Sequence, residues 1–85
     1  MTMTMTTTTT SPAQRAAAIR SRLDALLREH AEVKARVAEY QRRRWLSAGE
    51  TLELKTLQRL KLQKKDAIVA LEAELTTIER TIELD

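Results

Sequence analysis

Most of the chemistry that this sequence offers comes from cationic side chains in the second half of the chain. Residues 42–65 contain eight basic and two acidic residues, a net charge of +6, whereas residues 66–85 have a net charge of −5. Proteins use guanidinium and ammonium groups to neutralise phosphates and indole rings to stack on bases. The candidate anion-binding residues are Arg42, Arg43, Arg44, Trp45, Arg59, Lys61, Lys64 and Lys65.

Three interpretations of this basic segment stay open. The charged heads can be solvated while their aliphatic stems cover apolar neighbours. Alternatively, Arg42, Arg43 and Arg44 contact the phosphates of RNA, DNA or a ribosome, with Trp45 stacked on a base. The third interpretation is that the segment binds an anionic membrane surface. For Trp45 itself we expect packing over a turn between helices, with base stacking as the alternative.

Residues suited to catalysis are almost absent. The chain has no Cys and one His, which excludes disulfides, thiolate metal sites, thiol catalysis and a multi-histidine metal site. We find no paired carboxylates, no nucleophile with a base and no Gly-rich phosphate loop. His30 is interpreted as a polar residue that sets helix register. The sequence predicts a protein that is not an enzyme, with no catalytic residue, metal, cofactor or small-molecule substrate.

The elements that position these residues are predicted to be two helices. Residues 13–46 and 50–85 contain neither Gly nor Pro, and the apolar residues are almost all Leu, Ala, Ile and Val, which excludes a sheet. Two Ser-x-x-Gln/Glu capping signatures begin at Ser11 and Ser47. We expect a tail over residues 1–11, one helix over about 12–46, a turn with Gly49 over about 47–49 and a second helix over about 50–84.

Heptad spacing predicts that the helices form an antiparallel coiled-coil hairpin. Ala16 and Leu54 take a positions, Ile19 and Leu57 take d positions, and each seam continues for about four repeats. One register then pairs Ile19 with Leu75, Leu23 with Leu71, Leu26 with Ile68, Val37 with Leu57 and Tyr40 with Leu54. At the flanking positions it brings Arg20 near Glu72, Arg22 near Glu74 and Arg43 near Glu53.

The middle of this seam is weak. His30 falls opposite Lys64 and Val33 opposite Lys61, so two levels lack an apolar partner. A hairpin this small rarely gains more than about 3 to 5 kcal/mol from its core. We therefore expect a homo-oligomer, such as a four-helix arrangement. Its predicted surface consists of Leu27, Leu60, Leu62 and Val69.

The Met/Thr-rich start suggests a disordered tail, in which Met1, Met3 or Met5 could be the true start. It lacks the basic start and apolar run of a secretory signal. An organelle transit peptide is the alternative, because the chain has arginines but no acidic residue before Leu23. Apolar runs of three or four residues are too short to span a membrane.

Two blocks of the chain resemble the YdcH-like family, small bacterial proteins grouped as a domain of unknown function. The first block is His30-x-x-Val33-x-x-x-Val37, and the second runs from Leu57 to Ile68 as LQRLKLQKKDAI. Departures from the family pattern are Leu60, Lys64 and Ala67. The resemblance covers about half of the chain and implies a short, associating helical hairpin in the bacterial cytoplasm with no known enzyme activity.

Overall fold

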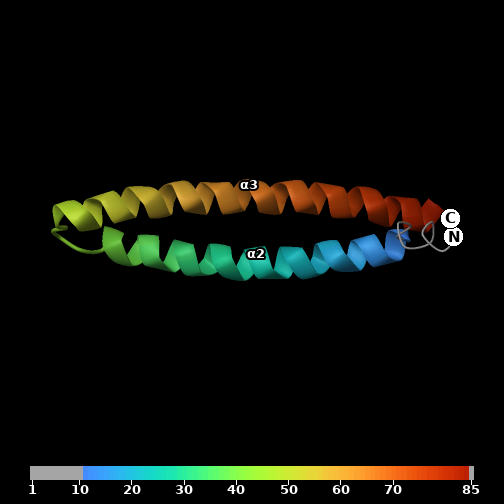
Figure 1. Cartoon of the computed structure of the whole chain (residues 1–85), viewed down its shortest axis with the longest axis horizontal. Coiled ribbons are helices and arrows are strands. Elements are labelled where there is room, and N and C mark those ends of the chain that lie inside the picture. The colour runs from blue at the N-terminus through green and yellow to red at the C-terminus, as the bar shows by residue number, and fades with distance from the viewer. Residues whose placement is uncertain (1–10, 85) are drawn as a thin grey trace, which may run out of the picture.

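The computed structural model describes residues 11–84, which form two antiparallel helices. Helix α2 spans Pro12–Gln41 and helix α3 spans Ala48–Leu84, and they lie side by side along their length (Figure 1). The connection lies at one end of the pair, and the start of α2 lies beside the end of α3 at the other. No strand occurs in the described residues. The predicted all-α helical hairpin is confirmed.

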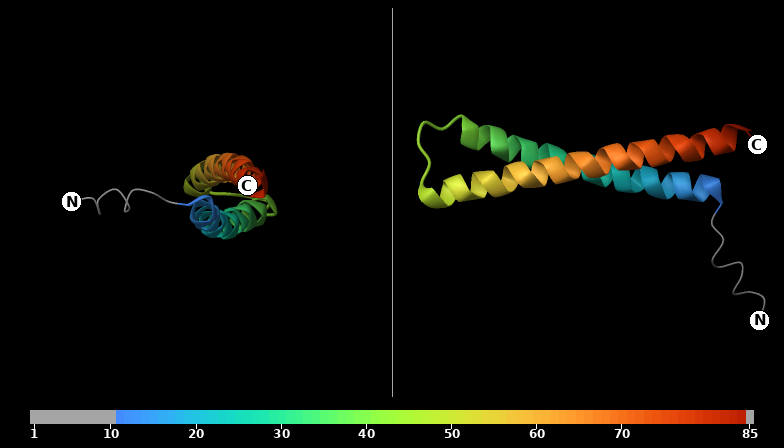
Figure 2. Two further views of the ribbon diagram at one scale, coloured as in Figure 1. Left: turned by 90° about the vertical axis from the view of Figure 1, so that its right-hand side faces the viewer. Right: turned by 90° about the horizontal axis from the view of Figure 1, so that it is seen from above.

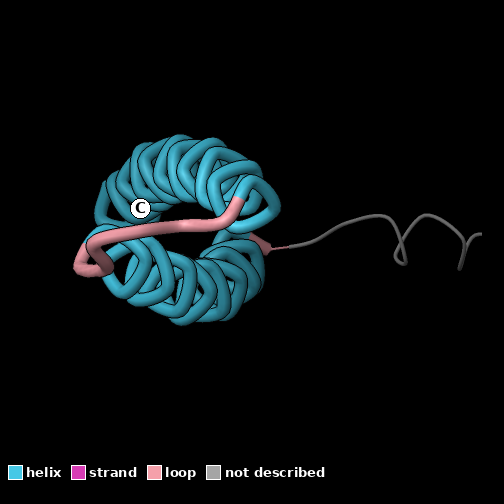
Figure 3. Tube along the Cα trace, turned by 90° about the vertical axis from the view of Figure 1, so that its left-hand side faces the viewer, coloured by secondary structure: helices cyan, strands magenta, loops and turns pink. Residues whose placement is uncertain are grey.

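The two helices wrap around each other and bury one seam. They cross near their middles when seen from above (Figure 2), and the view from the connected end shows the same winding (Figure 3). All buried side chains in the described range occupy the predicted a or d positions, as a coiled coil requires. They are Ala16, Ile19, Leu26, Val33, Val37, Leu57, Ile68 and Ile78.

Two apolar clusters agree with the predicted register. The cluster near the open end contains Ala16, Ile19 and Ile78, with Leu71 and Leu75 packed against it. The cluster toward the connection contains Val33, Val37 and Leu57, with Tyr40, Leu54 and Leu60 packed against it. Ile19 and Leu75 share the first cluster, and Val37 and Leu57 share the second. One alignment of the arms therefore holds at both ends of the hairpin.

Both helices begin with the capping boxes expected from the sequence. Ser11 Oγ accepts from the Gln14 amide while the Ser11 amide donates to Gln14 Oε1. Ser47 and Glu50 exchange the same two bonds at the start of α3. Each box satisfies two amide groups that the first helical turn leaves unpaired. Ser11 is thus the cap of α2, while the rest of the predicted tail lies outside the described residues.

The predicted turn over 47–49 is wrong, because the connection uses residues 42–47 instead. Helix α2 ends at Gln41 rather than near residue 46, and Arg44 lies in the connection rather than at the end of the seam. The Ser47 capping box makes Ala48 the first helical residue, so the chain that crosses between helices must come from earlier residues. Gly49 lies in the first turn of α3 without a positive φ.

Neither helix within residues 11–84 has an apolar stretch that could cross a bilayer.

Candidate functional site

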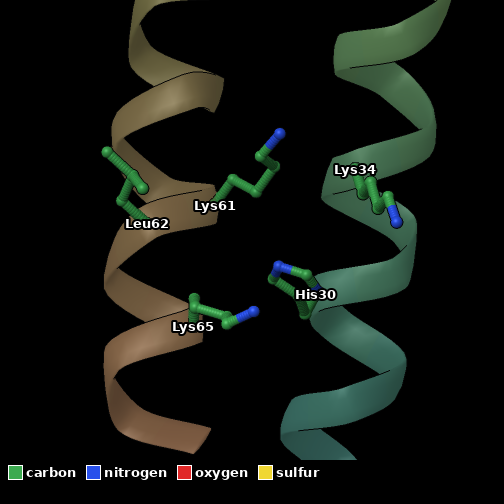
Figure 4. Close-up of a pocket in the computed structure, with 5 residues that line it drawn as sticks. All are labelled: His30, Lys34, Lys61, Leu62 and Lys65. Atoms are coloured by element: carbon green, nitrogen blue, oxygen red, sulfur yellow. The ribbon is translucent and has the colours of Figure 1, made fainter. Parts of the chain in front are cut away.

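The basic residues that the sequence grouped together lie in two separate places. Arg42, Arg43, Arg44 and Trp45 occupy the connection. Lys61 and Lys65 instead point toward α2 at the middle of the hairpin, where they line a pocket with His30 and Lys34 (Figure 4). A rise of 1.5 Å per residue puts Lys61 about 20 Å from the start of α3. The expectation of a single basic tip is therefore wrong for the lysines of α3.

The connecting segment presents a solvent-exposed indole and two exposed arginines. Trp45 is 76% exposed, so the expectation that it packs over the turn is wrong. Its position follows from the early end of α2, which leaves Trp45 in non-helical chain rather than on a helix face. Arg42 and Arg44 are also exposed, and neither forms an ion pair within residues 11–84.

Arg43 differs from its neighbours because its guanidinium is held by the protein. It donates to Glu50 of α3 and lies 3.8 Å from Glu39 of α2. The same group lies 4.9 Å from the centre of the Tyr40 ring, a cation–π distance. The pKa of Glu50 is lowered, first by the Ser47 amide that donates to it and also by Arg43. Arg43 thus clamps the end of α2 to the start of α3.

Glu53 takes partners other than the predicted Arg43. Arg36 donates to Glu53 Oε2 at 2.8 Å, and the Tyr40 hydroxyl donates to Glu53 Oε1. The bond to this carboxylate raises the pKa of Tyr40, because losing the phenolic proton would place two negative oxygens together. The three side chains join both helices near the connection.

The other predicted flanking pairs also differ in the structure. Arg20 donates to Glu79 at 2.6 Å instead of Glu72. Glu79 and Glu72 are one heptad apart at the same flanking position, and the long arginine side chain selects the further one. Arg22 and Glu74 form no ion pair within residues 11–84. Heptad position therefore predicts the side of the hairpin on which a pair forms better than it predicts the partner.

Lys64 is compensated although it occupies a seam position. Its Nζ lies 2.9 Å from Glu29 Oε1, and the side chain is half-buried. The hydrogen bond and charge of Lys64 lower the pKa of Glu29. The aliphatic stem can cover the seam while the ammonium reaches the carboxylate at its edge. Lys64 is thus engaged within its own chain.

Four nitrogen-bearing side chains line a pocket between the helices. In Figure 4 the side chains of His30, Lys61 and Lys65 extend into the space between α2 and α3, whereas Lys34 lies along α2 and points away from α3. His30 and Lys61 are half-buried at a positions of the seam. The side chains lining the pocket are His30, Lys34, Lys61, Leu62 and Lys65, none of which is acidic. The sequence analysis missed Lys34, although its position one heptad after Leu27 places it on the same face.

Three of the four residues predicted for self-association form an exposed apolar surface. Leu27 is 45% exposed, Leu62 is 62% exposed and Val69 is 52% exposed. Leu62 and Val69 are one heptad apart on α3, and Leu62 also lines the pocket, so this surface and the pocket share a face. Leu60 instead packs against the cluster of Val33, Val37 and Leu57. Its assignment to the free surface was wrong, because it closes the flank of the seam.

These features define the chain as an all-α antiparallel helical hairpin with one face that is both apolar and basic. Comparisons with protein-family models, curated proteins and solved structures find no match to it. The resemblance of the blocks beginning at His30 and Leu57 to the YdcH-like family therefore stays a prediction from those residues.

Proposed function

We propose that the protein is a non-enzymatic structural or interaction module that acts in the cytoplasm by associating with copies of itself. The cytoplasmic location rests on the family resemblance. The observation that carries self-association is the exposed surface of Leu27, Leu62 and Val69. Covering it removes apolar area from water, which favours association in proportion to the area buried. A second copy supplies the apolar partner that a two-helix hairpin lacks on this face.

The spacing of residues on α3 supports a two-fold arrangement. If two α3 helices pack antiparallel with Leu62 of one copy against Val69 of the other, the same register brings Arg59 opposite Glu72. Because a two-fold axis repeats each contact, the stripe formed by Leu62 and Val69 on each copy supplies one half of the interface. Arg59 and Glu72 are exposed, and neither forms an ion pair within residues 11–84. Apolar and charged contacts thus favour the same register.

Replacing Leu62 and Val69 with Glu is expected to reduce the particle to a monomer of about 9.7 kDa. The substitutions put like charges where the two stripes would meet, while both positions face solvent in the single hairpin. Helicity should therefore fall much less than the molar mass. Sedimentation equilibrium and circular dichroism over a range of concentrations measure both quantities.

The matched control carries Leu52→Glu and Leu84→Glu, which add the same two charges at exposed leucines of α3 away from the stripe. It should keep the mass of the parent protein. A parent that is monomeric at every concentration would contradict self-association, and an unchanged mass in the Leu62→Glu, Val69→Glu variant would contradict this surface.

The connecting segment supports a second function, binding RNA, DNA or a ribosome. The observation in its favour is the exposure of Trp45 between Arg42 and Leu46, in a segment that also exposes Arg44. An exposed aromatic ring beside cationic side chains can stack on a base while the cations neutralise phosphates.

Replacing Arg42 and Arg44 with Gln should weaken binding to single-stranded RNA and flatten its salt dependence. Each phosphate that the variant no longer neutralises should change the slope of log affinity against log salt by about 0.7. A variant with Arg15→Gln and Arg80→Gln lowers the net charge equally at the other end of the hairpin and should keep the slope. Fluorescence anisotropy of labelled RNA measures this. Equal slopes in the two variants would contradict a site in the connection.

A further inference from the structure

The pocket between the helices differs from the other charged contacts of the hairpin. Lys64 is bonded to Glu29, Arg43 to Glu50 and Arg20 to Glu79. The pocket cations, by contrast, form no ion pair within residues 11–84, and no carboxylate lines the pocket. Lys34, Lys61 and Lys65 are therefore left without a carboxylate partner among the described residues.

Two of these side chains occupy positions where a coiled coil normally places apolar residues. His30 and Lys61 are half-buried at a positions, on opposite helices. A polar residue at such a position costs stability. Lys34 and Lys65 are exposed and add positive charge near the half-buried Lys61, whose partial burial strengthens the repulsion between like charges. An anion in the pocket would convert this repulsion into attraction.

We propose that this pocket binds a phosphate group. The ammonium groups of Lys61 and Lys65 would donate to phosphate oxygens, and the His30 ring would supply a further N–H donor. Lys34, which also lines the pocket, would add positive charge. Leu62 also lines the pocket. The ligand comes from one of two sources, a free polyphosphate anion or the backbone of a nucleic acid strand, because both present the same phosphate oxygens. The site is separate from the connecting segment, and it shares Leu62 with the surface proposed for self-association.

Each candidate anion site contains a residue that occurs once in the chain, so one titration can tell them apart. His30 is the only histidine and lies in the pocket, and Trp45 is the only tryptophan and lies in the connection. Tripolyphosphate added to the full chain at constant ionic strength should shift the NMR signals of the His30 ring saturably and leave Trp45 fluorescence unchanged. A saturable change in Trp45 with no change in His30 would overturn the proposal, as would no saturable change in either.

Lys61→Gln with Lys65→Gln should weaken tripolyphosphate binding at least about tenfold, since each substitution removes a charged hydrogen-bond donor. The matched control, Lys55→Gln with Arg80→Gln, removes two charges from the same helix outside the pocket and should change the affinity less than about twofold. Equal losses in the two variants would show nonspecific charge attraction and overturn the proposal. Circular dichroism confirms that both variants remain helical.

A second titration with single-stranded RNA distinguishes the two sources of phosphate. If RNA moves the His30 signals and the Lys61→Gln, Lys65→Gln variant weakens that effect, the pocket accepts a nucleic acid backbone. If only tripolyphosphate moves them, the ligand is a free phosphate anion. Either pattern supports a phosphate site at His30. Unchanged His30 signals with both probes would contradict it.

Discussion

Replacing Leu57 with alanine should lower the free energy of unfolding by about 2 to 3 kcal/mol, within the range for truncation of buried leucines. Leu57 is buried in the cluster with Val33 and Val37, near the connected end of the hairpin. A single core of this size supplies only about 3 to 5 kcal/mol. The substitution should therefore leave a substantial fraction of the chain unfolded at room temperature, which urea titration followed by circular dichroism will measure.

Leu52→Ala is the matched control for that change. It removes the same atoms from the same helix, but Leu52 is 67% exposed. Alanine has a slightly better helix propensity than leucine, so the control should stay within about 0.5 kcal/mol of the parent protein. If both variants lost equal stability, the cluster around Leu57 would not be the source of the hairpin's stability. Both titrations should use one protein concentration, because self-association would add to the measured stability.

The fold could be predicted from the sequence because one periodic signal determines it. Apolar residues at heptad spacing face one direction on each helix, and only one alignment brings Ile19 to Leu75 and Val37 to Leu57 together. Burial at the a and d positions then follows from geometry alone. The two capping boxes were equally predictable, since Ser11 with Gln14 and Ser47 with Glu50 are local in the chain.

The connection could not be predicted with the same accuracy. The only glycine suggested a turn through Gly49, yet the Ser47 capping box starts the helix before it. Heptad spacing continued to Arg44, but periodicity alone does not show where a helix must stop to let the chain cross to its partner. The exposure of Trp45 depends on that stop. The sequence therefore named Arg42, Arg44 and Trp45 as candidates, but their exposure in a non-helical segment is apparent only in the folded chain.

The candidate anion site shows how residues close in sequence differ in their contacts once they lie on different faces. Lys61, Lys64 and Lys65 form one basic run, but Lys64 turns to Glu29 while the other two line the pocket with Lys34. A long side chain can form an ion pair one heptad away from the predicted partner, as Arg20 does with Glu79. Charge counted along the sequence therefore showed that basic residues are concentrated in this segment, but it did not show which of them lie together in the folded chain.

Replacing Ser47 with alanine should cost about 1 kcal/mol, because the Ser47 hydroxyl accepts from the Glu50 amide and caps α3. Ser11→Ala is the matched control, since Ser11 makes the same capping box at the open end of the hairpin. A loss there should be near the lower limit of about 0.5 kcal/mol, because helix ends that are not tied to a connection already fray. Urea titration measures both variants, and a larger loss from Ser11→Ala would contradict the special role of the connection.

The cost of losing Ser47 should also depend on pH. The Ser47 amide, the Ser47 side chain and Arg43 all lower the pKa of Glu50 below its ordinary value of 4.5. Between the lowered pKa of Glu50 in the folded chain and its ordinary pKa of 4.5 in the unfolded chain, the folded chain binds fewer protons. The contribution of Glu50 to stability is therefore fully present above pH 4.5 and is lost as the pH falls through the folded pKa. Ser47→Ala loosens the capping box and brings the pKa of Glu50 back toward 4.5. The difference in free energy of unfolding between parent and variant should therefore narrow in acid.

Glu50→Gln keeps an oxygen that can accept from the Ser47 amide but cannot titrate. In that background the difference in free energy of unfolding caused by Ser47→Ala should stay constant across the same pH range. A gap that narrows equally in the Glu50→Gln background would assign the acid response to another carboxylate, such as Glu29, whose pKa is lowered by Lys64.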